Sequence, residues 1–88
     1  MSRTLTVGAA QMGAIQRADT RADVVERLIA LLRRGAEAGC DLVVFPELAL
    51  TTFFPRWYVQ DRSEFDHFFE TELPGPETRP LFDEASRL

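Results

Sequence analysis

The chain has 88 residues, of which 45% are hydrophobic and 27% are charged, so its composition excludes a disordered tail and a fibrous repeat. Fourteen acidic and ten basic residues give a net charge of −4, and the basic residues are scattered, so we expect no nucleic-acid partner. A single cysteine excludes an internal disulfide and a metal site built on two cysteines.

The first predicted element is a strand. Leu5, Val7 and Ala9 alternate with small residues, a pattern typical of a strand that is buried on both faces. Polar residues and glycines interrupt this run, so it does not resemble a secretory leader. The apolar runs are also far shorter than the ~20 residues of a membrane span. We therefore expect a cytoplasmic protein without a membrane partner.

A helix is predicted over residues 21–38. Thr20 and Asp23 form a pair like a capping box at its start, and Gly39 supplies a left-handed residue after its end. The apolar side, expected to pack on a sheet, consists of Val25, Leu28, Ile29, Leu32 and Ala36. The charged side, expected to face solvent, consists of Glu26, Arg27, Arg33, Arg34 and Glu37.

A second strand is predicted over residues 41–46, because this β-branched run is apolar on both faces and fits the middle of a sheet. Pro46 ends the strand, since proline cannot donate a ladder hydrogen bond. The order strand, helix, strand is a βαβ unit, in which the two strands are parallel. The predicted fold class is therefore α/β.

The remaining residues predict shorter elements. Residues 48–57 are apolar without periodicity and indicate a packed loop, and residues 73–76 indicate a rigid turn. Ser63 is expected to cap a short helix, and Thr78 to cap the last helix. The buried side of the short helix is expected to hold Phe65, Phe68 and Phe69. The apolar side of the last helix comprises Leu81, Phe82, Ala85 and Leu88.

Glu47 is the strongest candidate for a catalytic residue. It directly follows the second predicted strand, at the edge where ligands gather in open α/β sheets. Partial burial at that edge strengthens a carboxylate as a base, which suits it to proton abstraction. A structural Glu that caps the strand end or forms an ion pair has the same spacing, so both interpretations stay open.

The other candidate residues carry weaker signals. Phe53 and Trp57 are candidates for an apolar substrate pocket, although aromatic residues in a packed loop are more often core. Cys40 follows the helix terminus that disfavours a thiolate, and we interpret it as inert. His67 lies among carboxylates without a second set of ligands, so we predict no metal site. No glycine motif indicates a nucleotide cofactor.

The motif Phe45-Pro46-Glu47 resembles the first signature of the carbon-nitrogen hydrolase (nitrilase) superfamily. The longer strings FPELALTTFFPRW (45–57) and TELPGPETRPLF (71–82) are similar to the branch that hydrolyses N-carbamoyl-D-amino acids. The resemblance covers essentially the whole chain. It implies a four-layer αββα sandwich, of which residues 1–88 form the amino-terminal βαβ part within a single domain.

The resemblance further implies a Cys-Glu-Lys triad that releases a D-amino acid, ammonia and carbon dioxide from a small N-carbamoyl amino acid. In that triad Glu47 takes the thiol proton, a Cys attacks the carbamoyl carbon, and a Lys stabilises the oxyanion. The family's pattern implies no metal and no organic cofactor. It also implies that the full-length enzyme is a homo-oligomer, a dimer or a tetramer.

The chain departs from the family's pattern, because it has no Lys and its Cys40 precedes Glu47. We therefore expect an amino-terminal fragment that is inactive alone. Two alternatives stay open. One is another amidase, nitrilase or ureidopropionase-like enzyme of the superfamily, against which the loop sequence at residues 51–57 argues. The other is a non-catalytic interaction module, if the chain truly ends at Leu88.

Overall fold

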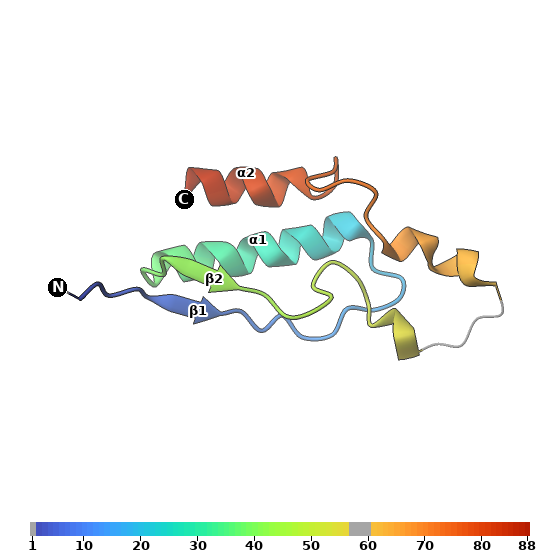
Figure 1. Cartoon of the computed structure of the whole chain (residues 1–88), viewed down its shortest axis with the longest axis horizontal. Helices are drawn as coiled ribbons and strands as arrows, with labels where there is room; N and C mark the ends of the chain where they lie inside the picture. Colours follow the sequence, from blue (N-terminus) through green and yellow to red (C-terminus); the bar gives the residue numbers. More distant parts are fainter. Residues whose placement is uncertain (1, 57–60) are drawn as a thin grey trace.

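The computed structural model describes residues 2–56 and 61–88. The two strands are β1 (Val7–Ala9) and β2 (Leu42–Val44), and the two α-helices are α1 (Arg21–Glu37) and α2 (Arg79–Arg87). Two 3-10 helices, η1 (Phe54–Arg56) and η2 (Arg62–Phe68), lie between β2 and α2. Figure 1 shows three layers, with α1 between the sheet and α2. None of the helices in the described ranges is long and apolar enough to cross a membrane.

The sheet consists of β1 and β2, which pair in parallel and confirm the predicted βαβ unit and the α/β class. The register pairs Val7 with Leu42, Gly8 with Val43 and Ala9 with Val44. Both strands are shorter than the sequence pattern predicted. Backbone hydrogen bonds nevertheless continue the pairing beyond the strands, since Ala10 donates to Val44 at 2.8 Å and Asp41 donates to Thr6 at 2.7 Å.

The caps of α1 are confirmed. The Thr20 hydroxyl accepts a hydrogen bond from the Asp23 amide at 3.1 Å, and the Asp23 carboxylate accepts one from the Thr20 amide at 3.2 Å. This reciprocal pair satisfies two backbone donors that the first helical turn leaves without partners. At the other end, Gly39 follows the helix with the predicted positive φ, of +82°.

The buried residues of the core are concentrated on α1, which packs on the sheet. Val25 and Leu28 of the predicted apolar side are buried, and the other three residues of that side are half-buried. Val24 is also buried, although the sequence analysis did not place it on that side. Gly35 allows the helix to approach the sheet, because a Cβ atom there would lie 2.7 Å from Cγ2 of Val43. That separation is well inside van der Waals contact, so the helix can pack at this distance only without a side chain at position 35.

The prediction that both faces of the strands are buried is wrong for the described residues. Leu5, Val7, Leu42 and Val44 each remain about half exposed, at 52%, 54%, 49% and 51%. Side chains alternate along a strand, and α1 covers only the face that carries Val43. The opposite face has no covering layer in the described parts of the chain, which leaves these apolar side chains in contact with solvent.

One predicted helix cap is wrong, and another is confirmed only in its position. Asp61, not Ser63, caps η2, since its carboxylate accepts hydrogen bonds from the Ser63 amide at 3.0 Å and hydroxyl at 2.7 Å. Thr78 occupies the predicted N-cap position of α2, but its hydroxyl makes no capping hydrogen bond there. The hydroxyl instead accepts one from the Gly75 amide at 2.8 Å and so holds the preceding turn. A hydroxyl at this position can bond either to the backbone of the helix or to the backbone of the preceding turn, and in this structure it bonds to the turn.

The aromatic residues before α2 form a small cluster centred on Phe54. Its ring stacks on that of Phe68, with centroids 5.1 Å apart, and also contacts the rings of Phe65 and Phe69. Phe68 is buried as predicted. Phe69 is 60% exposed, which contradicts its predicted place on the buried side, because η2 ends at Phe68 and the backbone of Phe69 is extended.

Two arginines from the charged side of α1 reach other segments instead of facing only solvent. Arg33 donates from Nε to the Glu84 carboxylate of α2 at 3.0 Å. Arg27 donates from Nη1 to the carbonyl of Ala14 at 3.0 Å. The solvated side of α1 is therefore smaller than the sequence predicted.

Candidate active site

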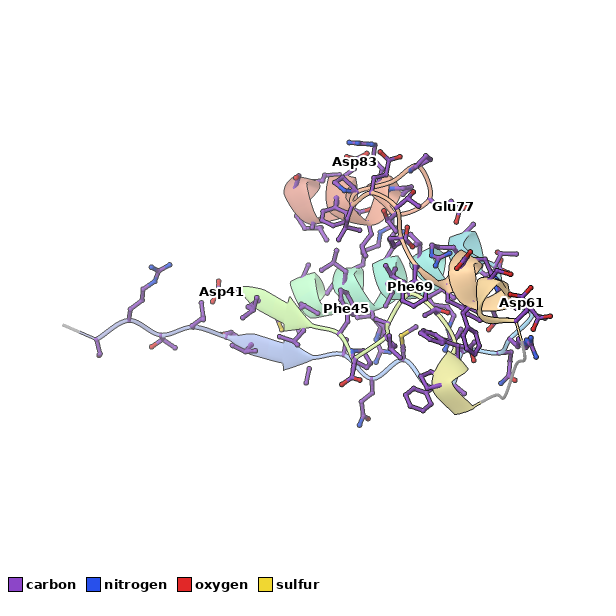
Figure 2. The ribbon with its side chains drawn as sticks, turned by 45° about the vertical axis from the view of Figure 1, so that its right-hand side comes forward. Asp41, Phe45, Asp61, Phe69, Glu77 and Asp83 are labelled. Carbon is purple, nitrogen blue, oxygen red and sulfur yellow. The ribbon has the colours of Figure 1, made fainter. Side chains whose placement is uncertain are left out.

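The segment that follows β2 determines where the Glu47 side chain lies. Figure 2 shows Asp41 at the start of β2 and Phe45 just beyond its other end, from which the chain continues to Glu47. The strand ends at Val44, before Pro46, as the missing proline donor predicted. Leu48 then has a φ of +53°, a left-handed conformation that costs a non-glycine residue about 1 kcal/mol. The chain thus turns sharply directly after Glu47.

Glu47 lines a recess of about 180 Å³, which we name the Glu47 recess. One side is the loop that follows β1, and the other is the loop that follows β2. Because the strands are parallel, both loops leave the same edge of the sheet, as Figure 1 shows. The lining residues are Met12, Gly13, Ala14, Ile15, Pro46, Glu47, Leu48, Ala49, Thr51 and Phe53.

The recess combines a single charged group with apolar walls. Among the residues that the structure describes, Glu47 is the one ionisable side chain in the lining, and Thr51 is the one hydroxyl. Ile15 and Phe53 contribute apolar surface. A lone carboxylate beside apolar walls suits proton transfer from a group that is placed next to it.

The expectation that Glu47 is partly buried is wrong for this structure, in which its side chain is exposed. The recess is open to solvent, and no described segment covers its outer side. The two loops position Glu47, but they leave its carboxylate exposed to solvent. Desolvation of this carboxylate therefore requires an additional covering group, such as a substrate or a further protein segment.

The structure brings one predicted substrate-binding residue to Glu47. Phe53 lines the same recess and is 56% exposed, so its ring is accessible to a bound molecule. The second predicted substrate-binding residue, Trp57, lies outside the described residues. The sequence placed both in one loop, but it did not reveal that this loop faces the loop after β1.

Cys40 lies away from the recess. It precedes β2, whereas Glu47 follows it, so the strand separates the thiol from the carboxylate. The Cys40 sulfur lies beside Gly8 of β1, where a Cβ atom would be only 2.9 Å from Sγ. In the described ranges, the recess therefore holds a candidate base without a neighbouring thiol.

His67 has the surface position that its acidic neighbours indicated. Its side chain is exposed, and its backbone carbonyl accepts hydrogen bonds from both terminal nitrogens of Arg21 at 3.2 Å. Across residues 2–56 and 61–88, no three His, Cys, Asp or Glu side chains lie close enough to hold a metal ion together.

The family model of carbon-nitrogen hydrolases matches residues 6–88. The match includes both strands, both loops of the Glu47 recess and the Phe45-Pro46-Glu47 motif. The chain belongs to the carbon-nitrogen hydrolase family. This finding confirms the resemblance at the level of the superfamily, and it assigns the chain to enzymes that hydrolyse carbon-nitrogen bonds.

One contact of this carbon-nitrogen hydrolase chain was missed by the sequence analysis. Arg27 reaches behind the loop that forms one wall of the Glu47 recess, where it donates to the carbonyls of Ala14 and Met12. The sequence placed Arg27 on a solvated helix face. An arginine's spacing within a helix does not reveal which carbonyls it reaches, so the sequence held no signal for this contact.

Proposed function

We propose that the chain supplies Glu47 as the general base of an enzyme that hydrolyses N-carbamoyl-D-amino acids. The observation that carries the proposal is the place of Glu47, which is the one charged side chain among the described residues that line a recess at the carboxyl edge of a parallel sheet. Family membership supports the hydrolysis of a carbon-nitrogen bond. The similarity of residues 45–57 and 71–82 to the carbamoyl-hydrolysing branch supports the substrate class.

In the proposed reaction, a cysteine thiol transfers its proton to Glu47 and its sulfur attacks the carbamoyl carbon. A lysine ammonium group stabilises the oxyanion of the tetrahedral intermediate. The carbon-nitrogen bond to the terminal amino group breaks, and that nitrogen takes up a proton and leaves as ammonia. Water then hydrolyses the thiol-bound carbamoyl group, and the carbamate that is released decomposes to the D-amino acid and carbon dioxide.

The other two members of the triad are proposed to come from further residues of the same domain. The chain contains no lysine, and its one cysteine lies beyond the opposite end of β2. A second sheet packed on the uncovered face of the first would produce the αββα sandwich of the family. The half-exposed side chains of Val7, Leu42 and Val44 on that face support this arrangement. Association of complete domains as a homo-oligomer belongs to the same proposal.

Phe53 and Trp57 are proposed to contact the side chain of the substrate. Support for Phe53 comes from its place in the recess wall beside Glu47. Support for Trp57 comes from the sequence string alone. An apolar wall next to the base favours N-carbamoyl amino acids with apolar side chains over those with charged ones.

The test replaces Glu47 with Gln in a protein that joins this chain to the rest of a carbon-nitrogen hydrolase domain. Ammonia release from N-carbamoyl-D-phenylalanine should fall roughly 10²- to 10⁴-fold, because the isosteric amide cannot accept the proton. Glu72→Gln, at an exposed glutamate outside the recess, is the control and should retain full turnover. Unchanged turnover in Glu47→Gln contradicts the proposal.

A panel of substrates separates this proposal from its nearest alternative. Simple amides and nitriles should be hydrolysed far more slowly than N-carbamoyl-D-amino acids by the joined protein. A preference for an amide or a nitrile would instead indicate another branch of the superfamily. The 88-residue chain by itself should release no ammonia above the buffer background.

A further inference from the structure

The guanidinium group of Arg27 joins α1 to the loop that forms one wall of the Glu47 recess. Nη1 donates to the carbonyl of Ala14 at 3.0 Å, and Nη2 donates to the carbonyl of Met12. The carboxylate of Asp19 lies 3.8 Å from Nη1 and forms an ion pair with the Arg27 guanidinium group. One side chain thus fixes two carbonyls on either side of a single residue.

That intervening residue is Gly13, and its backbone explains how both carbonyls face Arg27. Gly13 has a φ of +72°, a conformation that side-chain-bearing residues rarely adopt. A Cβ atom added there would still lie 3.8 Å from Nη2, so space does not prevent a side chain. The glycine is required by the turn, which aims the carbonyls of Met12 and Ala14 at the same planar group.

The opposite side of this loop faces Glu47. Met12, Gly13, Ala14 and Ile15 all line the Glu47 recess, whereas Arg27 does not. Arg27 therefore lies behind the wall, where it cannot touch a molecule bound in the recess. Its influence on that molecule passes through the position of the loop.

We infer that Arg27 is a positioning residue of the hydrolase site, which sets the distance between the loop after β1 and Glu47 and thereby the place of the bound substrate. This inference rests on the proposed function of Glu47. Because the loop lines the recess, it would contact a substrate bound there in the ground state and the transition state alike, so a displaced wall should weaken binding more than it slows the chemical step.

The planar fork of arginine suits this role better than lysine does. A guanidinium group presents parallel N–H donors that reach two carbonyls at once, whereas an ammonium group acts as a point charge on a flexible stem. Arg27→Lys should therefore preserve the positive charge but hold the loop after β1 only in part. Arg27→Met preserves length and apolar packing but removes every donor.

The first experiment measures the loop directly in the 88-residue chain. Backbone ¹⁵N order parameters of residues 12–15 should fall from about 0.85, typical of rigid backbone, to below about 0.6 in Arg27→Met. The control is Arg34→Met, at an exposed arginine of the same helix, and it should leave these values unchanged. Order parameters that stay high in Arg27→Met overturn the inference, whatever the role of Glu47.

The second experiment measures kinetics in the joined protein described above. Arg27→Met should raise KM for N-carbamoyl-D-phenylalanine on the order of tenfold, while kcat changes less than about twofold. Arg27→Lys should give an intermediate KM, and it replaces Arg27→Met if that variant does not fold. A mobile loop together with parental KM and kcat overturns the inference, because the loop would not then position the substrate.

The failure of the proposed function has a different signature. In that case Glu47→Gln retains turnover, while the order parameters of residues 12–15 still fall in Arg27→Met. That combination overturns the role of Glu47 and leaves the contact between Arg27 and the loop supported. The two results are thus read from separate variants and separate measurements.

Discussion

Arg33 of α1 and Glu84 of α2 form the ionic contact between the two helices, with Arg33 Nε 3.0 Å from Glu84 Oε2. Arg87 pairs with the second oxygen of the same carboxylate. Glu84 is only 9% exposed. The hydrogen bond from Arg33, assisted by Arg87, holds the pKa of Glu84 below its ordinary value of 4.5, although desolvation opposes this shift.

A carboxylate whose pKa is lowered by folding makes stability depend on pH. The contribution of Glu84 is fully present above its ordinary pKa of 4.5 and is lost as the pH falls through the lower folded-state value. We expect Glu84→Gln to unfold at lower temperature than the parent at pH 7, and the difference to shrink below pH 4.5. Thermal unfolding followed by circular dichroism across this pH range measures it.

The control for this prediction is Asp83→Asn. Asp83 is the neighbouring acid and lies on the side of α2 away from α1 (Figure 2). In Asp83→Asn, the change in unfolding temperature between pH 7 and pH 4 should stay close to that of the parent. An equal response of both variants would show that the contact between Arg33 and Glu84 does not determine the acid sensitivity.

The capping box of α1 predicts a second stability effect. Thr20→Ala removes the hydroxyl that accepts from the Asp23 amide, and we expect a loss of about 1 kcal/mol in the free energy of unfolding. Thr20→Ser retains the hydroxyl and should remain near the parent. Urea denaturation of the three proteins compares them, and equal midpoints would contradict the role of the cap.

Gly35 predicts an effect opposite to helix propensity. Alanine favours a helix by about 1 kcal/mol over glycine, yet its Cβ atom would overlap Cγ2 of Val43. Because overpacking costs about 1–3 kcal/mol, we expect Gly35→Ala to destabilise the chain. Adding Val43→Ala should recover part of that loss in a double-mutant cycle. A stabilising Gly35→Ala would show that the helix can move away from the sheet without cost.

Phe53 predicts an effect on substrate recognition in the joined protein. Phe53→Ala removes apolar surface beside Glu47, so KM for N-carbamoyl-D-phenylalanine should rise roughly fivefold, whereas KM for N-carbamoyl-D-alanine should change little. Phe69→Ala is the matched control, because Phe69 has a similar exposed fraction but lies outside the recess lining. A KM increase of the same size for both substrates would argue against contact with the substrate side chain.

Local sequence patterns predicted most of the elements. The helical spacing around Leu28, the pair of Thr20 and Asp23, and the glycine at position 39 each act within one element, and all three appear in α1 as expected. The parallel pairing of β1 and β2 followed from the order of elements. The position of Glu47 at the carboxyl edge of the sheet followed from the same reasoning.

Features that depend on distant partners were not predictable. Arg33 lies 51 residues from Glu84 along the chain, and nothing in either neighbourhood identifies the other. Burial of the strands depends on what covers each face, so Val7 and Val44 were assigned a buried place that they do not have. A local ambiguity was a second source of error, because the Thr78 hydroxyl could bond the backbone of either the helix or the turn, and the sequence did not distinguish the two.

The parallel pairing of β1 and β2 has a consequence for how this molecule can change during evolution. Both walls of the Glu47 recess are loops outside the hydrogen-bonded ladder, so the side chains of these loops can vary while the strands keep their register and Arg27 keeps its bonds to backbone carbonyls. Substitutions that adapt the recess to a new substrate therefore need not disturb the packing of α1 on the sheet. The recess can therefore be reshaped through side chains of its walls, whereas Gly13 and Arg27 have to stay because they hold one wall to α1.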